Sequence, residues 1–195
     1  MFINLAHYKS KAFTLIEVLI ALIIFALTFL GFAALQAKLL RISQDSFHRS
    51  IAINMASNIM ERMYANIKGV EDRFYDNPNG NFTANPSCLG VNVSGVANGS
   101  SCTPQELALN DFYEWNSLLK GAAATTWQDA ITAILPQASG IVCIDSTPDD
   151  GTEANPACDG VTNSGSPTIY AVKIWWHERT DNSTHRYVYA FQPSS

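Results

Sequence analysis

The first feature of the chain is a long uninterrupted run of apolar residues near its start. From Phe13 to Leu35 every residue is apolar or small except Thr14, Thr28 and Glu17. At about 1.5 Å per helical residue, this stretch spans roughly 34 Å, which is enough to cross a bilayer core of about 30 Å. The pattern therefore predicts a transmembrane helix that carries one acid near its first turn. An acid inside such a segment is costly in lipid, so Glu17 is a candidate functional residue.

The apolar pattern then changes from continuous to periodic without a helix-breaking residue. No proline occurs between Phe13 and Asn77, so the helix can continue from Gln36 to Lys68. In this second half an apolar residue recurs every four positions, which indicates an amphipathic helix lying against a globular head. The predicted stripe consists of Phe47, Ile51, Met55, Ile59, Met63 and Ile67, with Ala52, Ala56 and Met60 beside it.

After this helix the chain alternates between loops and short helical patterns. Residues 69–101 are rich in turn formers and are expected to be surface loop. Thr103 and Glu106 form a capping-box pattern with Pro104 between them, which predicts a helix from Pro104 to Lys120. A second, shorter helix is expected over Thr126–Leu135.

Three strand patterns close the chain, at Gly140–Asp145, Thr168–His177 and His185–Phe191. The last two are joined by a predicted hairpin turn, so an antiparallel sheet is expected to cover the long helix. On the middle strand one face is the expected core side and the other is expected to point away from it. The core face comprises Tyr170, Val172, Ile174 and Trp176, and the opposite face comprises Lys173, Trp175 and His177. These elements predict an α+β fold.

The start of the chain resembles the leader of the type IV pilin family. Lys9 and Lys11 precede the apolar run and favour a cytoplasmic N-terminus. A small residue, Ala12, is followed by Phe13 and then by Thr-Leu-Ile-Glu17-Val-Leu. The resemblance implies that a prepilin peptidase cuts between Ala12 and Phe13 and methylates the new amine, although the family usually has glycine where Ala12 stands. An ordinary uncleaved anchor or a secretory signal is the alternative.

The same resemblance implies a role for Glu17 and a division of the chain. When subunits stack, the amine freed at Phe13 of one subunit can meet the Glu17 carboxylate of its neighbour, so that a pair replaces two lone charges. The implied parts are a leader over residues 1–12, a transmembrane and polymerisation helix over 13–35, and a periplasmic or extracellular head over 36–195. The implied fold is type IV pilin-like, with the long helix packed on a small antiparallel sheet and short extra helices.

A narrower resemblance concerns the head. The segments Asp111–Leu119 and Ile134–Gly140, together with the order of elements, are similar to PilV-type minor pilins, the type IV pilus modification proteins. This implies a minor pilin that helps to prime pilus assembly and serves adhesion and twitching motility. Its implied partners are other minor pilins, the major pilin, the prepilin peptidase and the inner membrane. A pseudopilin of a type II secretion system and a DNA-binding competence pilin are the alternatives.

The composition fits an exported protein with a mildly acidic head. The formal charge is −5, and removing residues 1–12 takes away two lysines and no acid, which leaves 10 cations against 17 acids. This argues against a nucleic-acid-binding surface that covers much of the protein. All of the cysteines follow the apolar run, and their spacing does not suit a zinc site. Among three possible pairings, Cys88 with Cys102 and Cys143 with Cys158 are preferred, because each closes a short loop.

The sequence offers little that suggests catalysis. No Ser-His-Asp, Cys-His or glycine-rich phosphate pattern stands out, so no catalytic residue, cofactor, metal or small-molecule substrate is predicted. Two weaker candidates follow from clusters of charge. A calcium site is conceivable among Asp145, Asp149, Asp150, Glu153 and Asp159, for which solvated turns are the alternative. A DNA surface is conceivable among Lys173, Trp175, His177, Arg179, His185 and Arg186, for which a solvated strand face is the alternative.

Overall fold

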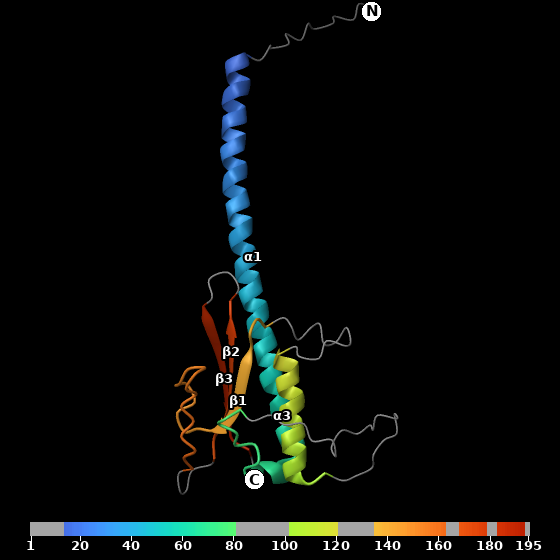
Figure 1. Ribbon diagram of the computed structural model, residues 1–195. Coiled ribbons are helices and arrows are strands. Elements are labelled where there is room, and N and C mark those ends of the chain that lie inside the picture. Colours follow the sequence, from blue (N-terminus) through green and yellow to red (C-terminus); the bar gives the residue numbers. More distant parts are fainter. Residues whose placement is uncertain (1–13, 81–101, 121–134, 163–167, 179–182, 194–195) are drawn as a thin grey trace, which may run out of the picture. The chain divides into compact units, whose positions relative to one another are not determined.

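The computed structural model describes residues 14–80, 102–120, 135–162, 168–178 and 183–193. The chain divides into two compact units, residues 1–46 and residues 47–195, and each is described by itself. The predicted boundaries at residues 12/13 and 35/36 stay predictions. The long helix, α1, extends over Leu15–Ala65 and so contributes to both units (Figure 1).

In the first unit, α1 is a bare apolar rod. Its large side chains are exposed along the whole stretch, for example Leu15 at 84% and Phe25 at 69%. Within the described residues, α1 is the one helix long and apolar enough to cross a membrane. Exposed apolar area of this extent costs free energy in water, so this part of the helix requires lipid or other helices around it.

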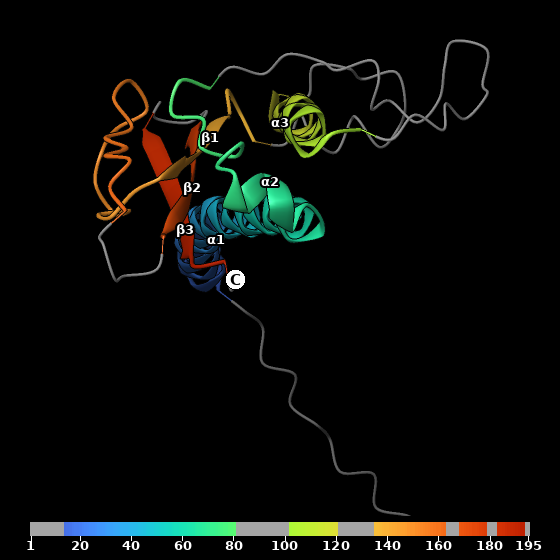
Figure 2. The same cartoon turned by 90° about the horizontal axis from the view of Figure 1, so that it is seen from below.

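The second unit is a small α+β domain, as predicted. It contains the end of α1, a short helix α2 (Ile67–Glu71), α3 (Pro104–Lys120) and three strands, β1 (Ser139–Ile144), β2 (Tyr170–His177) and β3 (Thr184–Phe191). The strands form one antiparallel sheet in the order β1-β2-β3. All three strand predictions are therefore confirmed to within two residues at either end. The helices lie on one side of the sheet, and the segment from Asp145 to Thr162 lies on the other (Figure 2).

The core lies between the helices and the first face of β2. Tyr170, Val172, Ile174 and Trp176 are all buried there, which confirms the predicted core face of this strand. On α3, Trp115 is fully buried, and its indole Nε1 donates a hydrogen bond to the backbone oxygen of Met55 on α1 at 2.9 Å. This single side chain thereby ties two helices together within the core.

The predicted stripe on α1 is correct only in its middle. The buried residues are Ala52, Ala56, Ile59 and Met63, whereas Phe47 is 52% exposed and Ile67 is 38% exposed. The reason is geometric, because a step of four residues turns an α-helix by about 40° more than one full turn. Over the four steps from Phe47 to Met63 the stripe drifts by about 160°, so its two ends cannot face the same sheet, and Ile67 lies beyond the end of α1, at the start of α2.

Two further expectations are corrected or fall outside the described residues. Gly69, expected at the start of a loop, lies inside α2, where its N–H donates to the Asn66 side chain at 3.2 Å and so helps to cap that helix. Residues 81–101, expected to be loop, lie outside the described ranges. So does nearly all of the short helix predicted over Thr126–Leu135, of which Leu135 alone is described and is not helical.

The start of α3 has the predicted capping box. The Thr103 hydroxyl accepts a hydrogen bond from the N–H of Glu106 at 3.3 Å, and the Glu106 carboxylate accepts one from the N–H of Thr103 at 2.8 Å. Two amide groups that have no partner within the helix are satisfied reciprocally in this way. The helix begins at Pro104 and ends at Lys120, as predicted.

Candidate functional site

In the first unit, the candidate site is the start of α1, where Glu17 lies in the first helical turn. The N–H of Glu17 donates to the Thr14 backbone oxygen at 3.1 Å and to the Thr14 hydroxyl at 3.4 Å, so Thr14 caps the helix. Glu17 is exposed, and no cation of the described chain lies within ion-pair distance of its carboxylate. The structure therefore presents an exposed acid on an apolar helix, without a cationic partner among the described residues.

The predicted processing site lies outside the described residues. This applies to both Ala12 and Phe13, so the cut between them and the methylation of Phe13 stay predictions. The role of Glu17 in pairing with a neighbouring amine also stays a prediction.

In the second unit, the most unusual side chain is Lys173, at the centre of the middle strand β2. It was expected on an outward-facing surface, but it is 0% exposed, and Trp175 beside it is 2% exposed. The expectation was wrong because the segment from Asp145 to Thr162 folds back over this face of the sheet (Figure 2). Strand periodicity shows which residues share a face, but it does not show which segment covers that face.

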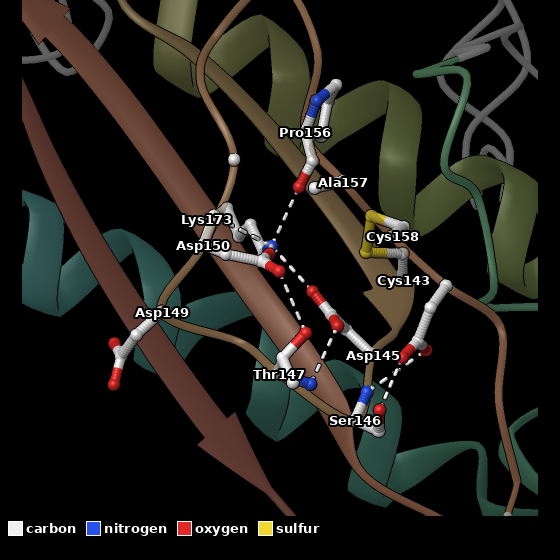
Figure 3. A network of polar contacts seen from close by, with 12 residues as sticks. Cys143, Asp145, Ser146, Thr147, Asp149, Asp150, Pro156, Ala157, Cys158 and Lys173 are labelled. Atoms are coloured by element: carbon white, nitrogen blue, oxygen red, sulfur yellow. Dashed lines mark hydrogen bonds and ion pairs between the residues drawn. A yellow bond between two sulfur atoms is a disulfide. The ribbon is translucent and has the colours of Figure 1, made fainter.

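The Lys173 ammonium is surrounded by oxygen atoms of the covering segment (Figure 3). Its Nζ lies 2.5 Å from Oδ2 of Asp145 and 3.3 Å from Oδ1 of Asp150. It also donates to the backbone oxygens of Pro156 at 2.7 Å and Asp150 at 3.2 Å. Asp145, like Lys173, is 0% exposed. A buried charge of this kind is tolerated only when it is paired, and here the partners come from a loop distant in sequence from β2.

A disulfide closes the same segment at its base. Cys143 on β1 is bonded to Cys158, with their Cα atoms 6.1 Å apart, which agrees with the preferred pairing. Cys143 packs with Ile141 and Trp175 in a small apolar cluster under the segment. Cys102 is also disulfide-bonded, and its expected partner, Cys88, lies outside the described residues.

Two more basic side chains, Arg186 and His177, fasten the covering segment to the sheet. On β3, the guanidinium of Arg186 donates to the backbone oxygens of Asp150 at 2.8 Å and Gly151 at 2.7 Å. At the end of β2, Nε2 of His177 lies 2.8 Å from the Glu153 carboxylate, which also accepts a hydrogen bond from Ser139 at 2.6 Å. Of the side chains predicted as a DNA surface, Lys173, His177 and Arg186 therefore hold the protein's own loop in place, His185 stacks on Trp176, and Arg179 lies outside the described residues.

The predicted calcium ligands do not converge on one point either. Among them, Asp145 and Asp150 face Lys173, Glu153 faces His177, and Asp159 bonds the hydroxyl and N–H of Ser146. Asp149 points away from this network (Figure 3). The Thr147 hydroxyl, with Lys173, lowers the pKa of Asp150, and the Ser146 hydroxyl together with backbone N–H groups lowers the pKa of Asp159. The only other clustered ligand set in the described chain, Cys143, Asp145 and Cys158, has its two sulfurs in the disulfide.

A second polar network, which sequence reasoning missed, ties α1 to α3. Arg62 donates to Glu114 at 2.6 Å and to Asp111 at 3.3 Å, and the Tyr75 hydroxyl donates to the other oxygen of Asp111. Burial raises the pKa of Asp111, while Tyr75 and Arg62 oppose that rise. Burial and the Asp111 carboxylate raise the pKa of the Tyr75 hydroxyl. Asp111 and Glu114 on α3 are distant in sequence from Arg62 and Tyr75, and the polar character of these side chains alone predicts exposure, so no sequence signal pointed to this network.

Comparison with known proteins identifies the start of the chain. Residues 8–33 match the prokaryotic N-terminal methylation motif, which is the type IV pilin prepilin leader. This stretch contains the predicted cleavage site and Glu17. No curated protein matches the chain. No solved structure matches it either. The motif supports a pilin- or pseudopilin-type protein, the α+β arrangement of the long α1 and the small antiparallel sheet is pilin-like, and the motif and helix fit anchoring in the inner membrane.

Proposed function

We propose that this chain, which carries the prepilin leader of type IV pilins, is a minor pilin: a low-abundance structural subunit of a type IV pilus. The observation that carries the proposal is the position of Glu17, an acid in the first turn of an otherwise apolar helix and within the methylation motif. The proposed role is structural rather than enzymatic. The resemblance of the chain to PilV-type minor pilins rests on the segments Asp111–Leu119 and Ile134–Gly140.

The proposed assembly step follows from charge. Cleavage before Phe13 creates a cationic amine, and Glu17 has no cationic partner in the described part of its own chain. A lone acid at the centre of a bilayer costs about 2.5 kcal/mol or more, and less near the membrane surface. When two subunits stack, the amine of one and the carboxylate of the other form an ion pair and lower this cost. The pair also sets the axial offset between neighbouring helices.

In this proposal the leader directs insertion into the inner membrane, and the head lies in the periplasm or, after assembly, on the pilus. The partners are other minor pilins and the major pilin, together with the peptidase that cuts the leader. A pseudopilin of a type II secretion system is the second candidate, because the methylation motif serves that class equally. We do not retain a DNA-binding role, because Lys173 and Trp175 are buried beneath the protein's own loop.

The test compares Glu17→Ala with Glu61→Ala, a matched removal of an exposed acid farther along the same helix. Each variant is expressed at native level in the source cells, and its amount in membranes and in sheared filaments is measured by immunoblot. We expect both variants to be inserted and cut, with mass spectrometry showing methylated Phe13. Glu17→Ala should be missing from the filament fraction, and Glu61→Ala should be present. Normal entry of Glu17→Ala into filaments would overturn the proposal.

The pilus and the secretion system are separated by deletion of the gene. Loss of surface pili or twitching motility with intact exoprotein secretion supports a minor pilin. Loss of secretion with intact pili supports a pseudopilin and contradicts the proposed assignment.

A further inference from the structure

The covering segment over β2 has the chemistry of a cation-binding loop. Four oxygen atoms converge on the Nζ of Lys173: two carboxylate oxygens, from Asp145 and Asp150, and two backbone oxygens, from Asp150 and Pro156. Carboxylate and backbone oxygens are the ligands that hard divalent cations prefer in proteins. Here the positive charge comes instead from a side chain of the sheet below.

The backbone of the segment is shaped to turn these oxygens inward. Gly151 has φ of +82°, and a Cβ at this position would lie 2.3 Å from the backbone oxygen of Pro156. Only glycine adopts this conformation and permits this close approach without strain. Arg186 holds the backbone oxygens of Asp150 and Gly151 from the β3 side. The segment therefore folds around positive charge in addition to the small apolar cluster of Ile141, Cys143 and Trp175 beneath it.

The ammonium is the cation that balances the buried acid. Asp145 is 0% exposed; its Oδ1 accepts a hydrogen bond from the N–H of Thr147 at 2.9 Å, and its Oδ2 lies 2.5 Å from Nζ of Lys173, the one cation within ion-pair distance of it among the described residues. The oxygens of Asp145 and Asp150 would repel each other if that charge were removed. On the sheet Lys173 pairs in register with Ile141 and Val188, so no cation stands directly opposite it, and Arg186 on β3 donates to the backbone oxygens of Asp150 and Gly151.

We infer that the segment from Asp145 to Pro156 is a cation-binding loop that carries its own cation. Lys173 takes the position that a divalent metal occupies in loops of the same ligand chemistry, so the loop folds without metal. Truncating Lys173 should leave an oxygen-lined, negatively charged cavity that takes Ca²⁺. This inference concerns the head alone and is independent of the proposed role in a pilus.

The test uses the full chain in detergent and compares wild type, Lys173→Ala and Lys173→Arg. The melting temperature is followed by near-ultraviolet circular dichroism, which reports on the tryptophans of the head, first with a chelator and then with millimolar calcium chloride. Calorimetric titration with calcium chloride measures binding directly. We expect wild type and Lys173→Arg to melt at a temperature that calcium does not change. Lys173→Ala should melt lower in chelator, recover in calcium and bind one Ca²⁺ per chain.

A second variant identifies the ligands. Adding Asp145→Asn to Lys173→Ala should abolish the recovery, because the buried carboxylate is lost. If Lys173→Ala does not fold in chelator, folding upon addition of calcium supports the inference, and failure to fold in either condition overturns it. Two further results would also overturn the inference. One is a folded Lys173→Ala whose melting temperature does not change with calcium and that binds none; the other is a wild type whose melting temperature depends on calcium.

Discussion

The disulfide between Cys143 and Cys158 permits a prediction whose size follows from the structure. The two cysteines are separated by 15 positions. In the chain-entropy description, a cross-link over a loop of this length stabilises a protein by about 3 kcal/mol, because it restricts the unfolded chain. For a domain of about 150 to 250 residues, this corresponds to a fall in melting temperature of about 6 to 12 °C when the cross-link is removed.

The perturbation is the double variant Cys143→Ala, Cys158→Ala. Alanine is preferred to serine because Cys143 is buried in an apolar cluster with Ile141 and Trp175. The folded loop should persist, because Lys173 and its oxygen partners do not depend on the cross-link. The variant should therefore retain the near-ultraviolet spectrum of wild type at low temperature and should melt about 6 to 12 °C lower.

The assay is thermal unfolding of the full chain in detergent, with and without a thiol reductant. The reductant supplies an internal control, because fully reduced wild type and fully reduced variant lack the same bond and should melt together. The reasoning is refuted if the oxidised variant melts within about 2 °C of oxidised wild type, which would correspond to less than about 1 kcal/mol. It is also refuted if the native spectrum is lost at low temperature, since the cross-link would then be holding the folded loop itself.

Two further predictions concern packing and acid stability. Gly140→Ala should destabilise the head by about 1–3 kcal/mol in thermal unfolding, because the new Cβ would lie 2.7 Å from the Trp115 ring and 2.8 Å from the Leu119 side chain. Leu119→Ala should lower the free energy of unfolding by less when it is added to Gly140→Ala than when it is added to wild type. If the two changes in unfolding free energy simply add, the predicted clash is contradicted. The lowered pKa of Asp159 means that its ionised form stabilises the fold above about pH 4 and that this contribution is lost as pH falls through the lower folded pKa. Melting temperatures from pH 7 to pH 3 should therefore fall less steeply in Asp159→Asn than in wild type, and equal slopes would contradict this.

The elements of the fold could be predicted from the sequence because each depends on neighbouring residues. The bounds of α3 follow from Pro104, the Thr103 capping box and a short amphipathic pattern. The three strands, which are six to eight residues long, could be predicted from short apolar or alternating apolar and polar runs. The α1 stripe was predicted less well, because a four-residue repeat only approximates the 3.6-residue turn and the error accumulates along a long helix.

The sequence predicted one part of the candidate sites and missed another, because only features that depend on neighbouring residues leave a sequence signal. Glu17 stands out in sequence because a single acid interrupts a long apolar run. Lys173 does not, since an alternating strand with one lysine is the usual pattern of a half-exposed sheet. Its burial depends on a loop that returns over the sheet, held by Cys158 and Arg186, and that return is a tertiary event with no periodic signal. Of the acidic residues considered as a calcium site, Asp145 and Asp150 pair with Lys173, whereas Glu153 pairs with His177 and Asp159 with Ser146.

The difference between the two units also explains why comparison recognises only residues 8–33. In the proposed processing and assembly, the leader and the first turns of α1 have to satisfy several position-specific requirements at once: a basic start, a small residue before an aromatic one, an acid at a fixed distance from the proposed new amine, and an apolar length matched to a bilayer. Moving one of these residues by a single position along the chain breaks the pattern. The head has only to bury a core and cover its sheet, and many sequences of similar volume and patterning achieve that. The methylation motif therefore supports a pilin- or pseudopilin-type protein from residues 8–33, a segment that lies wholly before the head.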